Sequence, residues 1–277
     1  MSVQVHDGSL PAAPIMRRPI IWFGASLIVA IGILAAGALR PDLELSAALS
    51  YFSRIAVYVT ILAGLWLGLG MTDAAHTTRL RHWMSVALPV TLWLAIIYWL
   101  ALTGAFRPRP AGWLPTPVAI FAPMLIGLPL LLRSKIIGTM LDRMPDWWLV
   151  AIQAYRVLGA TFLVAGAKGD LSSLFALPAG IGDITVGLLA IPTAYLLSKS
   201  GDGGRKLAIG WNVLGLLDFT IAIGVGILST LQIIVPDRPN VALGVFPAVM
   251  IPAFAVPSWT LLHALSLRQL RRKLRSK

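Results

Sequence analysis

The sequence contains no cysteine and little charge. The absence of cysteine excludes disulfide bonds and thiolate-bound metal ions. Only 12% of the 277 residues are charged and 57% are hydrophobic, whereas soluble domains are typically about 25% charged and about 45–50% apolar. The apolar residues are grouped in long runs. The composition therefore excludes a soluble globular protein and predicts an integral membrane protein whose main contact is the lipid bilayer.

Long apolar runs predict an all-α fold, a polytopic transmembrane helix bundle. A chain that crosses lipid must satisfy its own backbone hydrogen bonds, as a helix does, and barrel strands would alternate between apolar and polar residues. About eight runs have the length of one bilayer crossing, roughly 20 residues. They cover residues 19–39, 46–71, 83–103, 114–132, 146–167, 174–198, 207–230 and 241–266.

Proline interrupts two of these runs. The fourth run contains or adjoins Pro115, Pro117, Pro123 and Pro129, which leaves open whether it crosses the membrane completely. The last run contains Pro247, Pro252 and Pro257. Each proline removes a backbone donor and disturbs the preceding turn, so the last run is predicted to be a kinked helix.

The runs predict one transmembrane bundle domain over residues 19–267. Residues 1–18 are predicted to form a flexible cytoplasmic tail, and residues 268–277 a basic cytoplasmic tail. The sequence Ala36-Gly37-Ala38 resembles a signal-peptide cleavage site, but the apolar run before it is longer than a typical signal core. The first run is therefore expected to be an uncleaved membrane anchor.

Lysine and arginine are distributed unequally between the loops. If the eight runs are spans, 16 basic residues lie on one side of the membrane and 5 on the other. Basic loops face the cytoplasm, so both termini of this inner-membrane protein are expected there. The same bias explains the net charge of +12 without a nucleic-acid partner.

Three ionisable residues, Arg156, Asp183 and Asp218, lie near the middle of separate apolar runs. A charge at that depth costs several kcal/mol or more unless it is paired, protonated or turned to a polar cavity. Such residues usually serve a function, so these three form the centre of a candidate substrate-binding or proton-binding site.

Polar neighbours extend this candidate site. They are Gln153, Tyr155 and Asn212. The formal charge of Arg156, Asp183 and Asp218 sums to −1, and Arg156 can neutralise one carboxylate. The carboxylate left over is what a proton-coupled or cation-binding site needs. The alternative is a structural clamp in which the second aspartate is hydrogen-bonded to a polar neighbour.

A short motif suggests a further alternative. The sequence Gly180-Ile181-Gly182-Asp183 resembles the GxGD signature of intramembrane aspartyl proteases, with Asp218 as the second carboxylate. That resemblance implies water activation by two aspartates. In those families, however, the other aspartate precedes the motif, and the later Pro-Ala-Leu motif is absent here. A two-aspartate lipid hydrolase similar in outline to the lysoplasmalogenases is a related alternative.

No other motif indicates catalysis, a metal or a cofactor. The histidines are His6, His76, His82 and His263, and no two have the spacing of a helical zinc site. Nucleotide-binding and serine-hydrolase signatures are also absent. The sequence therefore assigns no catalytic residue and favours a protein that is not an enzyme.

Three segments carry a family resemblance. They are Tyr155-Arg156, Pro178–Asp183 and Trp211-Asn212 with Asp218. Over about residues 150–225 the chain resembles uncharacterised bacterial inner-membrane proteins, which implies no activity. The leading hypothesis is a proton-linked carrier of an ion or small solute, and a structural, sensory or assembly subunit is the main alternative.

Overall fold

The computed structural model describes residues 18–40, 45–107, 115–231, 233–238 and 240–275. These residues form helices and turns without any strand, which confirms the predicted all-α class. The predicted tail over residues 1–18 lies outside the described residues except for Arg18, and so do the last two residues of the chain.

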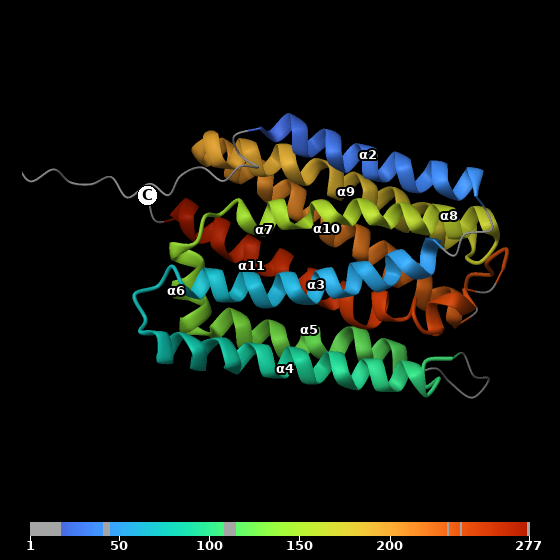
Figure 1. Cartoon of the computed structure of the whole chain (residues 1–277), viewed down its shortest axis with the longest axis horizontal. Coiled ribbons are helices and arrows are strands. Elements are labelled where there is room, and N and C mark those ends of the chain that lie inside the picture. The colour runs from blue at the N-terminus through green and yellow to red at the C-terminus, as the bar shows by residue number, and fades with distance from the viewer. Residues whose placement is uncertain (1–17, 41–44, 108–114, 232, 239, 276–277) are drawn as a thin grey trace, which may run out of the picture.

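The helices lie side by side as a bundle, with most axes along the long dimension of the molecule (Figure 1). The first half contains α2 (Pro19–Leu39), α3 (Leu45–Leu69), α4 (His76–Leu102), α5 (Pro115–Arg133) and the short α6 (Lys135–Arg143). The second half contains α7 (Trp148–Ala151), the 3-10 helix η1 (Ile152–Gly159), α8 (Ala160–Lys168), α9 (Ser173–Lys199), α10 (Gly201–Thr230), the 3-10 helix η2 (Val241–Gly244), the π-helix η3 (Ile251–Ala255) and α11 (Val256–Arg275).

Six helices among the described residues are long and apolar enough to cross a membrane. They are α2, α4, α5, the continuous segment Trp148–Lys168, α9 and most of α10. The helix α5 runs through Pro123 and Pro129 without a break, so the fourth predicted run is of spanning length. The chain is a multi-pass membrane protein.

Two of these helices form the centre of the bundle. About half or more of the most apolar part of Trp148–Lys168 and of α9 is buried, 61% and 50% respectively. The corresponding parts of α2, α4, α5 and α10 are 17% buried or less, which leaves their apolar side chains to face lipid. The two central helices are those that carry Arg156 and Asp183.

The last predicted run, 241–266, differs from a single kinked helix. It consists of η2, a turn, η3 and then α11. Pro252 lies in η3, and Pro257 lies at the start of α11, which continues η3 without a gap. The run is therefore interrupted only between η2 and Met250, and from there it is helical with a π-helical turn at Pro252. The approximate count of eight spans becomes six long helices, α3 and this interrupted segment. Beyond the run, α11 continues to Arg275, so residues 268–275 are helical.

The loops gather at two ends of the bundle. The basic end comprises residues 70–79, 133–146, 199–206 and 268–275, which ion pairs connect: Asp73–Arg143, Asp142–Arg272, Asp146–Arg205 and Asp146–Lys273. The opposite end comprises residues 169–173, 233–238 and 240–244, joined by hydrogen bonds from Ser172 to Asp237 and Asn240. The four segments of the basic end are those predicted to share one side of the membrane.

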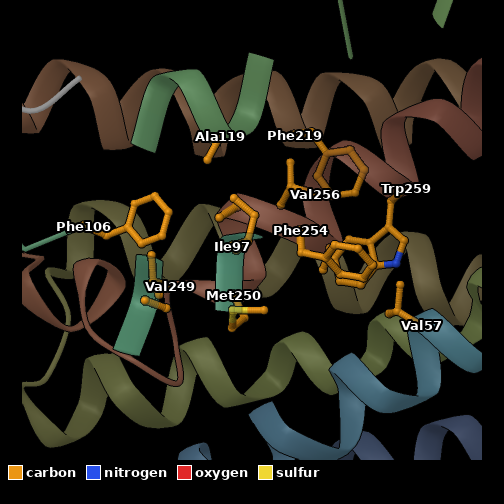
Figure 2. Packing of buried hydrophobic residues seen from close by; sticks show 13 residues of the cluster. Val57, Ile97, Phe106, Ala119, Phe219, Val249, Met250, Phe254, Val256 and Trp259 are labelled. Atoms are coloured by element: carbon orange, nitrogen blue, oxygen red, sulfur yellow. The ribbon is translucent and has the colours of Figure 1, made fainter. Parts of the chain in front are cut away.

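An aromatic core lies between these ends, where α10 and α11 meet η3 and the first helices (Figure 2). The rings of Phe219 and Trp259 are stacked with centroids 5.8 Å apart. Phe254, from η3, is also fully enclosed in this cluster. This core fixes the rotation of α10 and α11, and Phe219 follows Asp218 directly in the chain.

Candidate functional site

The 3-10 helix η1 presents Arg156 to the centre of the bundle. It is eight residues long, whereas 3-10 helices longer than about four residues are uncommon and often mark functional positions. With three residues per turn, Gln153, Arg156 and Gly159 lie on the same face. All three residues are buried, so this face packs against the neighbouring helices.

Arg156 pairs with both predicted aspartates. Its Nε donates to Oδ1 of Asp183 at 2.8 Å, and its Nη2 lies 2.7 Å from the same oxygen. The same Nη2 donates to Oδ2 of Asp218. The exposed fractions of Arg156, Asp183 and Asp218 are only 1%, 5% and 8%. The expected pairing of Arg156 is present, and it joins two carboxylates instead of one.

Glycines allow η1 and α9 to approach each other closely. A β-carbon added to Gly159 would lie 2.2 Å from Cβ of Asp183, and one added to Gly187 would lie 2.5 Å from the backbone nitrogen of Val157. Real β-carbons do not approach other atoms this closely. The helix α9 therefore lies directly against η1 through positions that have no side chain.

His263 also contacts Arg156, a role that the sequence did not predict. Its Nε2 lies 3.2 Å from Nη1 of Arg156, and its Nδ1 lies 2.9 Å from Oδ1 of Asn212. The Nδ2 of Asn212 donates to the carbonyl oxygen of Ala208 at 2.7 Å and to Ser266. Because this fixes Oδ1 of Asn212 as an acceptor, Nδ1 of His263 donates and Nε2 accepts from Arg156. Asn212 thus acts through His263 and does not touch either aspartate.

The other two predicted polar residues are not hydrogen-bonded to the carboxylates. Gln153 is 0% exposed, and neither its amide oxygen nor its nitrogen has a partner among the described residues. Tyr155 packs against Trp259 with ring centroids 5.5 Å apart. The structure therefore brings Arg156, Asp183, Asp218 and, through His263, Asn212 together, and it leaves Gln153 and Tyr155 outside this hydrogen-bonded group.

A cavity of about 580 Å³ begins at the two aspartates. Ligand sites in proteins usually enclose about 300–1,000 Å³. Among the lining residues of α9 and α10, Asp183 and Asp218 lie farthest along the helices from the opposite end, and residues 234–236, 240, 241, 243 and 244 of that end also line the cavity. Val235, one of these residues, is 87% exposed. The cavity thus extends from the buried carboxylates to the surface at the opposite end.

Most of the cavity wall is apolar, with four polar exceptions besides the aspartates. These are Thr116, Ser229, Asn240 and Trp259. In each, a buried donor atom has no hydrogen-bond partner among the described residues: the two hydroxyls, the Asn240 amide nitrogen and the Trp259 indole nitrogen. Buried polar groups are normally satisfied, so the cavity wall contains four buried donors that are not satisfied within the described residues.

Within the described residues, no group of three or more His, Cys, Asp and Glu side chains is arranged to hold a metal ion. The acidic pair Asp183 and Asp218 is occupied by Arg156. The geometry of this group is that of charge pairing at the end of an apolar cavity.

A family model described as a domain of unknown function (DUF8737) matches residues 113–271, more than half of the chain. The chain belongs to this family, which confirms the expected resemblance to a family without an assigned activity. The matched segment contains all the residues of the candidate site, from Gln153 to His263. No curated protein and no solved structure matches the chain.

Proposed function

We propose that this member of the DUF8737 family is a proton-linked carrier of a small solute in the cell inner membrane, with both termini in the cytoplasm. The group of Arg156, Asp183 and Asp218 would bind the proton and, through its two carboxylates, the charged part of the solute, and the cavity would hold the rest. In this arrangement the basic end faces the cytoplasm and the cavity faces the other side.

The observation that carries this proposal is the charge at the closed end of the cavity. One guanidinium pairs with two carboxylates, and His263 accepts a hydrogen bond from that guanidinium as a neutral ring. The buried group therefore has a formal charge of −1. A proton or a cationic solute would neutralise it, and leaving it uncompensated in a low dielectric is costly.

A structural clamp is the second candidate, and the contact of Arg156 with three helices supports it. The side chain joins η1 to α9, α10 and α11 through Asp183, Asp218 and His263. A structural clamp, however, does not explain why a cavity reaches the two carboxylates. The two-aspartate hydrolase has less support, because Nη2 of Arg156 lies between the carboxylates, where such an enzyme would hold its water.

The experiment is a potentiometric titration of the purified protein in detergent. We expect the wild type to bind one more proton near neutral pH than Asp183→Asn or Asp218→Asn, since either substitution leaves a neutral pair with Arg156. The matched control is Asp170→Asn, an exposed aspartate outside the cavity. Equal proton binding by the wild type and both variants would overturn the proposal, provided that thermal melting shows all four proteins folded.

A further inference from the structure

We infer that the solute is a lipophilic monovalent organic cation that enters from the opposite end and displaces the bound proton. This inference rests on the proposed function and names the class of its solute. It follows from three observations, which concern the sign of the charge that the cavity exposes, the composition of the cavity wall and the single uncompensated charge at the aspartates.

The charged groups that line the cavity are carboxylates, and the guanidinium of Arg156 is not among them. Arg156 does not line the cavity, whereas Asp183 and Asp218 do. The guanidinium carbon lies 4.0 Å from the ring centroid of Phe219, and its nitrogens are directed to the aspartates and His263. Each carboxylate keeps one oxygen, Oδ2 of Asp183 and Oδ1 of Asp218, without a hydrogen-bond partner among the described residues. An anionic solute would therefore meet negative charge and no accessible cation.

The composition of the cavity wall favours a solute whose main part is apolar. Four aromatic rings line the cavity: Phe162, Phe175, Phe219 and Trp259. Alanine, isoleucine and valine make up half of the remaining lining residues. Burial of apolar surface stabilises a complex by about 25 cal/mol per Å², and aromatic faces attract cations. Inorganic cations gain nothing from such a wall and would lose their hydration.

A single uncompensated negative charge links the binding of this solute to the binding of the proton. One negative charge is uncompensated at the closed end of the cavity, so a proton and a monovalent cation compete for the same group. Binding of the cation should release the proton.

The experiment uses the purified full chain in detergent and a pair of probes with the same shape and opposite charge. Isothermal titration calorimetry compares tetraphenylphosphonium with tetraphenylborate in two buffers of different ionisation enthalpy. The difference in heat between the buffers counts the protons released. We expect tetraphenylphosphonium to bind with release of one proton, and tetraphenylborate to bind about a hundredfold more weakly, or not at all.

Two pairs of variants test the place of binding. Asp218→Asn should weaken tetraphenylphosphonium about a hundredfold, and Asp170→Asn should not. Gly226→Leu should weaken it about tenfold or more by filling the cavity, because a β-carbon there meets only Cε2 of Phe175 at 4.0 Å. Its control is Gly224→Leu, on the same helix, outside the cavity and with nothing within 4 Å.

The outcomes separate this inference from the proposed function. Equal binding of the two probes, or binding of tetraphenylphosphonium without proton release, would overturn the cation class even if the titration finds the exchangeable proton. If the potentiometric titration finds no additional exchangeable proton in the wild type, the proposed function is overturned as well. If Asp218→Asn does not fold, Gly226→Leu still decides the place of binding, because unchanged affinity there excludes the cavity.

Discussion

A β-carbon added to Gly182 would lie 1.7 Å from Oδ1 of Asp218. The glycine before Asp183 therefore forms the surface against which the second aspartate lies. Gly182 brings α9 and α10 together at the level of Arg156, so the two carboxylates reach the same guanidinium only because this position has no side chain.

Gly182→Ala should displace Asp218 from Arg156. We expect the variant to lose about 1–3 kcal/mol of stability, the usual cost of overpacking a tight contact, and to melt at a lower temperature in detergent. The control is Gly210→Ala, a helical glycine of α10 with nothing within 4 Å, which should be neutral or slightly stabilising. Equal melting temperatures for Gly182→Ala and the wild type would show that α9 and α10 are not in close contact here.

Removal of Arg156 should be worse for folding than removal of either aspartate's charge. Arg156→Ala leaves Asp183 and Asp218 buried without a cation, at a cost of about 3–5 kcal/mol. Asp183→Asn and Asp218→Asn keep the volume and leave a neutral pair. Expression and thermal melting of the three variants would be compared. If both asparagine variants are as unstable as Arg156→Ala, the group serves as a structural clamp.

The loop at the opposite end should respond to acid through Asp237. The Ser172 hydroxyl donates to Asp237, and this hydrogen bond is the main reason why the pKa of Asp237 lies below its ordinary value of 3.8. Because the pKa is depressed in the folded protein, the contact stabilises the loop fully above the ordinary pKa, and its contribution is lost as the pH falls toward the folded value. Ser172→Ala should raise the pKa of Asp237.

Carbon-13 NMR titration of the Asp237 carboxyl would measure this change. Ser198→Ala serves as the control, because Ser198 bonds only within its own helix, to the carbonyl oxygen of Tyr195. An unchanged titration of Asp237 in Ser172→Ala would mean that the hydroxyl does not hold the loop.

The topology can be tested with reporters. Sixteen basic residues against five predict a cytoplasmic C-terminus and place the loop near Arg107 on the other side. A reporter fused at the C-terminus and one inserted near Arg107 should therefore give opposite signals. The same signal from both would contradict the proposed orientation.

Length and composition were sufficient to predict most of the helices. Residues 19–39 and 174–198 were predicted as runs, and α2 and α9 cover Pro19–Leu39 and Ser173–Lys199, because lipid requires long apolar helices whatever their neighbours are. The run 241–266 was predicted less well. Proline density indicates that a helix is disturbed, but whether it bends or divides depends on which residues satisfy the freed backbone groups.

The site was predicted in part for a similar reason. Arg156, Asp183 and Asp218 stand out because charge is rare in apolar runs. His263 does not, since it lies near the end of its run, and its contact with Arg156 depends on the depth and rotation of α11. The spacing of His263, Ser266 and Gln269, all buried on one face of α11, was the available signal. Gln153 was included for its position in the chain, which does not determine its partners.

The long 3-10 segment gives the central span an unusual mechanical property. A 3-10 helix rises about 2.0 Å per residue and an α-helix about 1.5 Å. If the eight residues of η1 rewound as α-helix, the span would shorten by about 4 Å and its two halves would rotate by about 160° relative to each other, since each residue turns about 20° less. A change of winding in η1 alone would thus turn Arg156 away from Asp183 while α9 and α10 stayed where they are.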